Sequence, residues 1–352
     1  AGTAATSSAT IESGGGSGID VSVAMAPITG DGIINAAEAN APTIAVKGTI
    51  TSEGGVATTV ILTVNGHDYT ATIDSQSGTW TADIATGDLL ADTLVVIRAT
   101  SADAAGNSTT ATTSHPYGID LTAPELTVAV DPVTADNVVN VSESGGSLAV
   151  TGKVSGEFNE GDVVTLTVNG TEYSGIAAAD GTWTIAVAGS DLAAATSLHV
   201  SVTTTDAAGN STTQAITHGY GVDTTAPELT ISVDSITSDN VINAAESGAA
   251  VSVAGQVNGE FNDGDTVTLT VNGTEYTGAV AADGTWAIAV AGADLAAATS
   301  LDVSVTTTDA AGNSTTQATT HSYGVDTTAP ELTVLVDPIT SDNVINAAES
   351  GA

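Results

Sequence analysis

The chain has 352 residues, with 3 Lys+Arg against 41 Asp+Glu and a formal net charge of −38 at pH 7. A charge of this sign argues against nucleic acid and anionic membrane surfaces as partners, because both need a basic footprint. Cysteine is absent, so no disulfide can form. No apolar stretch has the length of a membrane span, and no signal-peptide pattern opens the sequence. The hydrophobic fraction of 41% is too high for a disordered acidic tail, so we expect a folded chain.

The chain opens with a leader and continues as an internal repeat. Residues 1–19 are rich in Ser, Thr and Gly, which is typical of a flexible segment. Asp120-Leu-Thr-Ala-Pro124 recurs as Asp223-Thr-Thr-Ala-Pro227 and as Asp326-Thr-Thr-Ala-Pro330, a shift of 103 residues each time. The repeat predicts domains at 20–119, 120–222 and 223–325, followed at 326–352 by the opening strand and loop of a fourth.

Within a repeat, the hydrophobic pattern is that of strands. In the second repeat, alternation of apolar and polar residues predicts strand A near 125–131, B near 147–154, C near 163–168, F near 198–204 and G near 211–220, and each loop is named below by the two strands that it joins. Turn signals such as Asn169-Gly170 separate them. About seven short strands in roughly 100 residues predict an immunoglobulin-like sandwich. The predicted fold class is all-β, with tandem immunoglobulin-like β-sandwich domains in a linear rod and one core Trp in each.

Several motifs recur together at fixed spacing. They are the Asp-x-Thr-Ala-Pro opening, the Asp-Ala-Ala-Gly-Asn loop, the Val-Asn-Gly turn and the Asp-Gly-Thr-Trp strand. From about residue 20 to 352 the chain resembles bacterial immunoglobulin-like domains, the tandem extender modules of giant RTX adhesins exported by type I secretion. The resemblance implies an extracellular stalk at the bacterial surface, involved in attachment and biofilm formation. No Gly-Gly-x-Gly-x-Asp repeat is present, so the tip ligand is expected elsewhere.

The acidic loops are expected to meet where one repeat follows another. In such a sandwich the chain enters at the pole that carries the B–C and F–G loops, and the A–B loop lies at the opposite pole. Oxygen-rich clusters without sulfur or histidine suit Ca²⁺. The predicted metal ligands are Asp31, Asp120, Glu160, Asp162 and Asp206 at the first junction, Asp136, Asn137, Asp223, Asp263, Asp265 and Asp309 at the second, and Asp239, Asn240 and Asp326 at the third.

Two observations bear on this hypothesis in opposite directions. The first repeat has no predecessor of its own kind, and its opening and its Ser52-Glu-Gly-Gly-Val56 loop lack the corresponding acids, which favours an interface role. Asp and Asn in turns also cap their own backbone without any metal, and this alternative stays open for each residue. The tail at 326–352 is expected to be partly mobile unless Asp326 joins a metal site.

Catalysis has little support in the sequence. There is no cysteine, the five histidines do not have metal-binding spacing, and no Gly-x-Ser-x-Gly motif occurs. We therefore expect a non-catalytic extender whose partners are neighbouring repeats of the same chain, without membrane insertion. Low cytosolic calcium would keep the chain loose for export, and external calcium would then stiffen it. The alternative is an array of carbohydrate- or protein-binding modules that acts by avidity.

Overall fold

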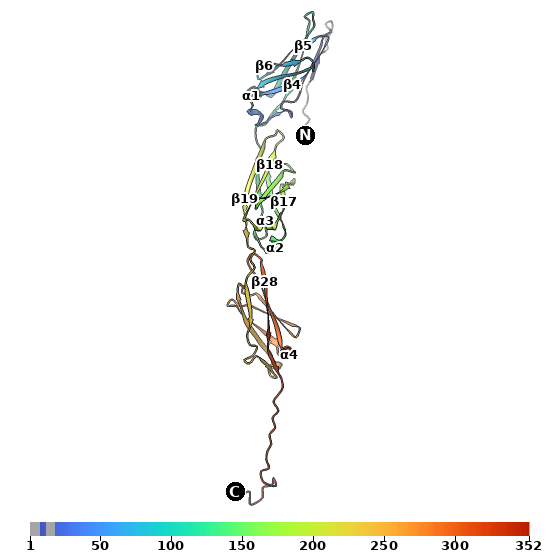
Figure 1. Cartoon of the computed structure of the whole chain (residues 1–352). Helices are drawn as coiled ribbons and strands as arrows, with labels where there is room; N and C mark the ends of the chain where they lie inside the picture. The colour runs from blue at the N-terminus through green and yellow to red at the C-terminus, as the bar shows by residue number, and fades with distance from the viewer. Residues whose placement is uncertain (1–7, 12–17, 352) are drawn as a thin grey trace. The chain divides into compact units, whose positions relative to one another are not determined.

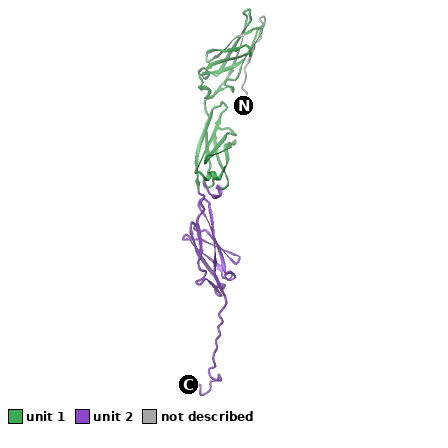
Figure 2. Ribbon diagram, in the orientation of Figure 1, with its two compact units in different colours: residues 1–137, 145–222 green, residues 138–144, 223–352 purple. Residues whose placement is uncertain are grey.

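The computed structural model describes residues 8–11 and 18–351. The fold is a series of β-sandwiches, which confirms the predicted all-β class (Figure 1). Contacts group the chain into two compact units, Ala1–Asn137 with Gly145–Val222, and Val138–Ser144 with Asp223–Ala352 (Figure 2). The domain boundaries inferred from the repeat remain predictions, so the sandwiches are named below by their strands.

The first sandwich lies in the first unit and is built from two antiparallel sheets. One sheet has the order β1 (Ser8–Ile11), β2 (Asp20–Met25), β4 (Thr43–Glu53), β8 (Thr79–Ala85), β7 (Thr72–Asp74). The other has the order β10 (Ser108–Pro116), β9 (Leu94–Ala102), β5 (Val56–Val64), β6 (His67–Thr70). A short parallel pair joins β3 (Ile33–Ile34) to β11 (Gly118–Ile119), and the helices are η1 (Glu38–Asn40) and α1 (Thr86–Ala91).

The second sandwich has the same plan. One sheet has the order β12 (Leu126–Val130), β14 (Ser147–Gly156), β17 (Thr182–Ala188), and the other the order β16 (Thr171–Ile176), β15 (Val163–Val168), β18 (Ser197–Thr205), β19 (Ser211–Gly219). Helix α3 (Gly189–Ala193) and strand β20 (Gly221–Val222) complete its part of the first unit. Strand β13 (Val138–Val139) and helix α2 (Val141–Ser144) belong to the second unit.

The third sandwich lies in the second unit. Its sheets have the orders β21 (Leu229–Val233), β23 (Ala250–Gly259), β26 (Thr285–Ala291), and β25 (Thr274–Ala279), β24 (Thr266–Val271), β27 (Ser300–Thr308), β28 (Ser314–Ser322). Strand β22 (Val241–Asn243) pairs in parallel with β29 (Gly324–Asp326), and the helices are η2 (Glu246–Gly248) and α4 (Gly292–Ala296). From 327 to 351 the chain forms turns but no helix or strand, and Asp326 lies opposite Asn243 rather than Asp239 or Asn240.

Local sequence explains the strand pairing. β18 runs beside β19 with an unbroken register from Ser197 opposite Gly219 to Thr205 opposite Ser211 (Figure 1). The tight turn between β15 and β16 is Asn169-Gly170, with φ of +50° and +76°. Positive φ at both positions is what a type I′ turn requires, and Asn-Gly is the pair that adopts it most readily.

The core of each sandwich is organised around one tryptophan packed on one glycine. Trp80 and Trp183 are each 2% exposed and Trp286 is 3% exposed, which confirms their predicted role in the core. A Cβ atom added at Gly48 would lie 2.0 Å from the Ala24 carbonyl oxygen and 2.3 Å from Trp80 Cζ2. A glycine at this position therefore lets the indole lie flat against the strand.

The short helices are features that the strand pattern did not predict. Helix α3 buries Leu192 in the core, and its Asp191 Oδ2 accepts a hydrogen bond of 2.5 Å from the Tyr173 hydroxyl. Tyr220 donates to the Leu192 carbonyl at 2.9 Å, and its burial raises the pKa of its phenol to about 12. These contacts tie the helix to the two outer strands of one sheet, to β16 through Tyr173 and to the end of β19 through Tyr220.

All basic side chains of the chain lie on interior strands. Lys47 is on β4, which has β2 and β8 as neighbours. Arg98 is on β9, between β10 and β5, and Lys153 is on β14, between β12 and β17. Across the described ranges, no helix is both long and apolar enough to cross a lipid bilayer.

Substituting Gly48→Ala tests the tryptophan–glycine packing. The new methyl group must displace a backbone carbonyl or the Trp80 ring, and overpacking of this kind costs about 1–3 kcal/mol. Gly87→Ala in the same sandwich is the matched control, because no atom lies within 4 Å of its added Cβ. Urea unfolding followed by tryptophan fluorescence should show a lower midpoint for Gly48→Ala alone, and equal midpoints would contradict the packing argument.

Candidate functional site

The F–G loop of the second sandwich, residues 206–210, is closed by its own aspartate. Asp206 Oδ1 accepts the backbone N–H groups of Ala208 at 2.9 Å and Asn210 at 2.8 Å. Its Oδ2 accepts the Asn210 side-chain amide at 3.0 Å. The hydrogen bond from the Asn210 side chain is the main reason that the pKa of Asp206 lies below its ordinary value. The loop therefore holds Asn210 in a fixed orientation.

Asn210 links this loop to the linker and to the first sandwich. Its Nδ2 also donates to the carbonyl oxygen of the linker residue Asp120 at 2.9 Å. Its Oδ1 accepts the Ala36 backbone N–H at 2.8 Å, and Asn35 Nδ2 donates to the Ala208 carbonyl oxygen at 2.9 Å. Asn210 is 5% exposed, so its amide is a buried polar group with its donors and acceptor satisfied.

The same contacts occur within the second unit. Asn313 Nδ2 donates to the Asp223 carbonyl oxygen at 2.9 Å, and Asn313 Oδ1 accepts the Val141 N–H at 2.8 Å. Asn140 Nδ2 donates to the Ala311 carbonyl oxygen at 3.0 Å. Asn313 is 4% exposed. The recurrence of all these bonds indicates one junction design used twice.

The A–B loop that meets each F–G loop is itself a closed turn. Asn35 N–H donates to Glu38 Oε2, and Glu38 N–H donates back to Asn35 Oδ1, both at 3.0 Å. Asn140 and Glu143 make the same reciprocal pair, again at 3.0 Å. Reciprocal bonding of this kind satisfies two backbone donors at once and stiffens the turn. Asn35 and Asn140 are thereby aimed at the loops they contact.

The first sandwich provides an internal comparison. Its F–G loop, residues 103–107, has the same internal bonds, because Asp103 accepts the N–H groups of Ala105 and Asn107 and the Asn107 side-chain amide. Ala105 and Asn107 are nevertheless exposed, whereas Ala208 and Asn210 are buried. The loop therefore forms without a neighbour, and burial comes from the contact with a preceding A–B loop.

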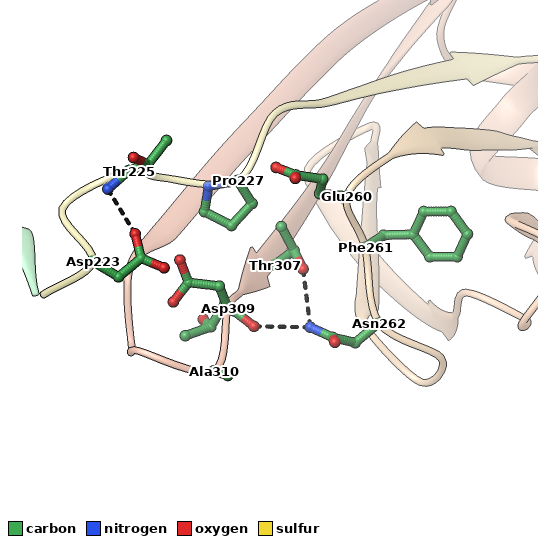
Figure 3. A pocket seen from close by; sticks show the side chains of 10 residues that line it. Asp223, Thr225, Pro227, Glu260, Phe261, Asn262, Thr307, Asp309 and Ala310 are labelled. Carbon is green, nitrogen blue, oxygen red and sulfur yellow. Dashed lines mark hydrogen bonds between the residues drawn. The ribbon is translucent and has the colours of Figure 1, made fainter. Parts of the chain in front are cut away.

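A cavity lies beside the F–G loop of the second sandwich and beside that of the third. In the third sandwich it has a volume of about 330 Å³ and is lined by Asp223, Thr225, Pro227, Glu260, Phe261, Asn262, Thr307, Thr308, Asp309 and Ala310 (Figure 3). The carboxylates of Asp223 and Asp309 point toward one another, and Phe261 points away from them. In the second sandwich the equivalent cavity of about 320 Å³ is lined by the corresponding residues, including Asp120, Glu157 and Asp206.

The cavity has the donor chemistry of a hard-cation site. Its charged lining residues are all carboxylates, and neutral oxygens are also present, such as the Thr307 hydroxyl and the Thr308 carbonyl, which hold the Asn262 amide. Asp120 Oδ1 accepts the Thr122 N–H at 3.1 Å, and Asp223 Oδ1 accepts the Thr225 N–H at 3.0 Å. No three His, Asp or Glu side chains gather into a metal-binding group within the described part of the chain. A cation here would rely on the paired aspartates and neutral oxygens.

The structure brings together part of the set of ligands predicted from sequence. Asp120 with Asp206, and Asp223 with Asp309, line the cavities. Glu160 and Asp263 are exposed and do not line them. The carboxylates of Asp162 and Asp265 cap their own B–C loops by accepting the backbone N–H of Asn159 at 2.8 Å and of Asn262 at 2.7 Å.

The predicted ligands of the A–B loops, and Asp326, are engaged in hydrogen bonds with other parts of the chain. Asp31, Asp136 and Asp239 each accept a hydrogen bond from the threonine hydroxyl two residues before them. Asn137 Nδ2 donates to the Gly219 carbonyl oxygen at 3.1 Å, and Asn240 Nδ2 to that of Ser322 at 3.0 Å. Asp326 Oδ1 accepts the Thr328 N–H at 3.0 Å. The turns at Asp31, Asp239 and Asp326 correspond to the Asx-turn alternative, because each carboxylate accepts the backbone N–H two residues later. Asn137 and Asn240 instead bond to the last residue of β19 and of β28.

Sequence reasoning missed two kinds of residue. Glu157 and Glu260 line the cavities, and each also accepts a backbone N–H at 3.0 Å, from Glu125 and Glu228 respectively. The available signal was the motif Glu-Phe-Asn, which occurs in the second and third repeats only. The linking role of Asn210 and Asn313 was also missed, because the same Asp-Ala-Ala-Gly-Asn sequence occurs in the first repeat, where its asparagine is exposed.

Comparison with solved structures finds strong similarity over most of the chain. A Ca²⁺-stabilized adhesin that helps an Antarctic bacterium reach out and bind ice is 46% identical, with a TM-score of 0.78 over 93% of this chain and 79% of that one. The chain belongs to the immunoglobulin-like extender domains of giant bacterial RTX adhesins. The extender is also 38% identical to a structure concerned with host-cell-surface retention of a 1.5-MDa bacterial ice-binding adhesin, with a TM-score of 0.65 over 88% of this chain and 98% of that one. Comparison with protein-family models and with curated proteins finds no match.

The junction of the extender is tested by Asn210→Ala. The substitution leaves the Ala36 N–H and the Asp120 carbonyl without their partner, and unpaired buried groups cost about 1–3 kcal/mol each. Amide exchange at Ala36 should accelerate about tenfold for each 1.4 kcal/mol lost. Asn107→Ala, the same change in the exposed loop, should leave the Ala36 amide unaffected; equal acceleration by both variants would refute the junction role.

The lowered pKa of Asp206 gives a pH dependence. A carboxyl whose pKa is lower in the folded state stabilises the fold above its ordinary pKa of 3.8, and this contribution is lost as the pH falls through the folded value. The pH titration of the Asp206 carboxyl group, followed by its carbon chemical shift in NMR, should have a midpoint below pH 3.8. Asn210→Ala should move this midpoint to a higher pH. A midpoint that is unchanged in Asn210→Ala would contradict the assigned cause.

Proposed function

We propose that this extender is a non-catalytic stalk segment of an adhesin at the bacterial cell surface, stiffened by Ca²⁺ at the junctions between repeats. Its role is to hold a distal adhesive region away from the cell. The partners of each repeat are its neighbours in the same chain, and the tip ligand binds elsewhere.

The junction of buried asparagine amides is the observation that carries the proposal. Asn210 bonds at once to its own loop, to the linker at Asp120 and to Ala36 of the preceding sandwich. A linker held in this way has few free torsions, and removal of hinge freedom is what a spacer requires. A catalytic site would not need the same contacts at two successive junctions.

Calcium fits the cavities beside these junctions. The Asp206 carboxylate uses three hydrogen bonds and keeps acceptor capacity, and Asp120 Oδ2 lies free of any hydrogen bond within the described residues. Ca²⁺ takes six to eight oxygens in flexible geometry, so two carboxylates with carbonyls, hydroxyls and water can hold it. Asp120 with Asp206, and Asp223 with Asp309, would be the principal ligands. The similar solved adhesin is Ca²⁺-stabilized.

The ion would supply positive charge that the chain lacks. The formal charge of −38 leaves facing aspartates without basic counterparts, so they repel one another until a cation binds. At low cytosolic calcium the junctions would stay loose during type I secretion, and external calcium would stiffen them afterwards.

The alternative function, an array of binding modules, has less support. Carbohydrate-binding surfaces use exposed aromatic rings as stacking platforms. The large hydrophobic side chains that are exposed in the described ranges are Val, Leu and Ile, without an aromatic residue. The tryptophans are buried in the cores.

Calcium dependence tests the proposal directly. Thermal melts and small-angle scattering of the whole chain are recorded in EDTA, in millimolar Ca²⁺ and in millimolar Mg²⁺. At calcium 100-fold above its Kd, binding adds about 2.7 kcal/mol, which corresponds to a rise in Tm on the order of 10 °C for a domain of this size. We expect Ca²⁺ alone to raise Tm and to lengthen and narrow the particle.

Paired variants locate the ions. Asp206→Asn and Asp309→Asn keep an oxygen acceptor in each loop but remove the charge, and should greatly reduce the calcium response. Asp103→Asn makes the same change in the loop that has no Asp-x-Thr-Ala-Pro linker, and should respond like the unmodified chain. Curves that superimpose in EDTA and calcium would reject the calcium site, and Asp103→Asn behaving like Asp206→Asn would reject its location.

A further inference from the structure

The leader of the chain supplies an extra strand to the first sandwich. β1 pairs antiparallel with the outer edge of β2, with Thr10 opposite Ser22 and Ile11 opposite Val21. β1 also contacts β10, the edge strand of the opposite sheet. It therefore closes the open side between the two sheets of this sandwich.

The equivalent edges in the other sandwiches have no such strand. β12 is the outer strand of β12-β14-β17, and β21 is the outer strand of β21-β23-β26, in the structure as described. The three edge strands are aligned by the residue that lies opposite the glycine under each tryptophan. Met25 lies opposite Gly48, Val130 opposite Gly152 and Val233 opposite Gly255. By this register Ser22 corresponds to Thr127 and to Thr230.

Side chains on the edge strand are more buried where the extra strand is present. Val23 on β2 is 1% exposed, whereas its equivalents Val128 and Ile231 are only half-buried. Ser22 is half-buried, whereas Thr127 and Thr230 are exposed. An edge strand presents unpaired backbone N–H and C=O groups, which are a template for another strand. β12 and β21 leave uncovered the kind of surface that β1 covers.

A groove marks both open edges. Beside β12 it has a volume of about 430 Å³ and is lined by Leu126, Thr127, Ser155, Gly156, Thr212 and Gln214 together with Pro124 and Glu125. Beside β21 it has a volume of about 590 Å³ and is lined by the equivalent residues, including Leu229, Thr230, Thr315 and Gln317. Each groove runs between the edge strands of the two sheets, which is where β1 lies in the first sandwich.

We propose that the edges of β12 and β21 accept the leader strand Ser8–Ile11 of a second copy of this chain. Strand addition of this kind gives affinity through main-chain hydrogen bonds and selectivity through alternate side chains. Ser-Ala-Thr-Ile is uncharged, so it adds no repulsion to a strongly acidic surface. Within the described residues, β2, β12 and β21 each offer such an edge and β1 is the leader strand, so neighbouring stalks can exchange leaders, with Thr10 of one copy opposite Thr127 or Thr230 of another.

Disulfide trapping tests this proposal, because the chain has no cysteine of its own. The whole chain carrying Thr127→Cys, and separately Thr230→Cys, is mixed with a synthetic peptide of residues 1–17 that carries Thr10→Cys as an activated disulfide. For each Cys variant, the rate of disulfide formation with the peptide is divided by the rate of disulfide formation between the same variant and a small neutral disulfide. We expect trapping at both positions to be at least tenfold faster than at Thr184→Cys. Thr184 is also an exposed threonine, on β17 at the other edge of the sheet that contains β12.

Two further measurements make the outcome decisive. A peptide with proline at positions 8 and 9 cannot form a regular strand pair, and should lose the excess rate. Full-length chains carrying Thr10→Cys should also form disulfide-linked dimers with chains carrying Thr127→Cys. Equal rates at Thr127→Cys and Thr184→Cys, or an undiminished rate for the proline peptide, would overturn the acceptor edge. If the peptide is trapped but the whole chains form no disulfide-linked dimers, a second copy of this chain is not the occupant of the acceptor edge.

Discussion

The side-chain amide of Asn210, repeated at Asn313, is the interaction on which the junctions depend. One planar group with two donors and two acceptor positions meets the F–G loop, the linker carbonyl and a backbone N–H of the preceding A–B loop. Because the amide is almost fully buried, any movement that breaks one of these hydrogen bonds leaves an unpaired polar group shielded from solvent. Hydrogen bonding to this amide therefore fixes the linker relative to both loops.

The acidic residues fall into two groups with different physics. Many of them close turns, as Asp180 does by accepting the backbone N–H and hydroxyl of Thr182. These carboxylates are stabilised by fixed donors and need no counter-ion. A smaller number of acids also face another carboxylate across a cavity, as Asp223 faces Asp309, which closes its own loop as well (Figure 3). Only this second group gives a reason to expect a bound cation, so total charge is a poor guide to the number of sites.

The sequence predicted the positions of the strands better than it predicted the residues of the candidate site. The strand expected near 198–204 is β18 at Ser197–Thr205, because alternation and turn residues are local signals. Asp162 was expected in the cavity but caps its own loop, whereas Glu157, five residues earlier, lines it. Which of several neighbouring acids turns inward depends on loop conformation, which spacing does not encode. Helix α3 was missed for a similar reason, since five residues are too few to establish a helical period.

The placement of the basic residues affects how well the protein resists proteolysis outside the cell. Trypsin-like proteases cut after Lys or Arg, and they need an extended segment of several residues that is free to enter their active site. Lys47, Arg98 and Lys153 are the only such residues in the chain, and each is in a strand paired on both sides. Residues 154–352 contain no such residue at all. Digestion by this class of enzyme must therefore wait for unfolding of the first or second sandwich, so proteolytic lifetime follows their folding stability.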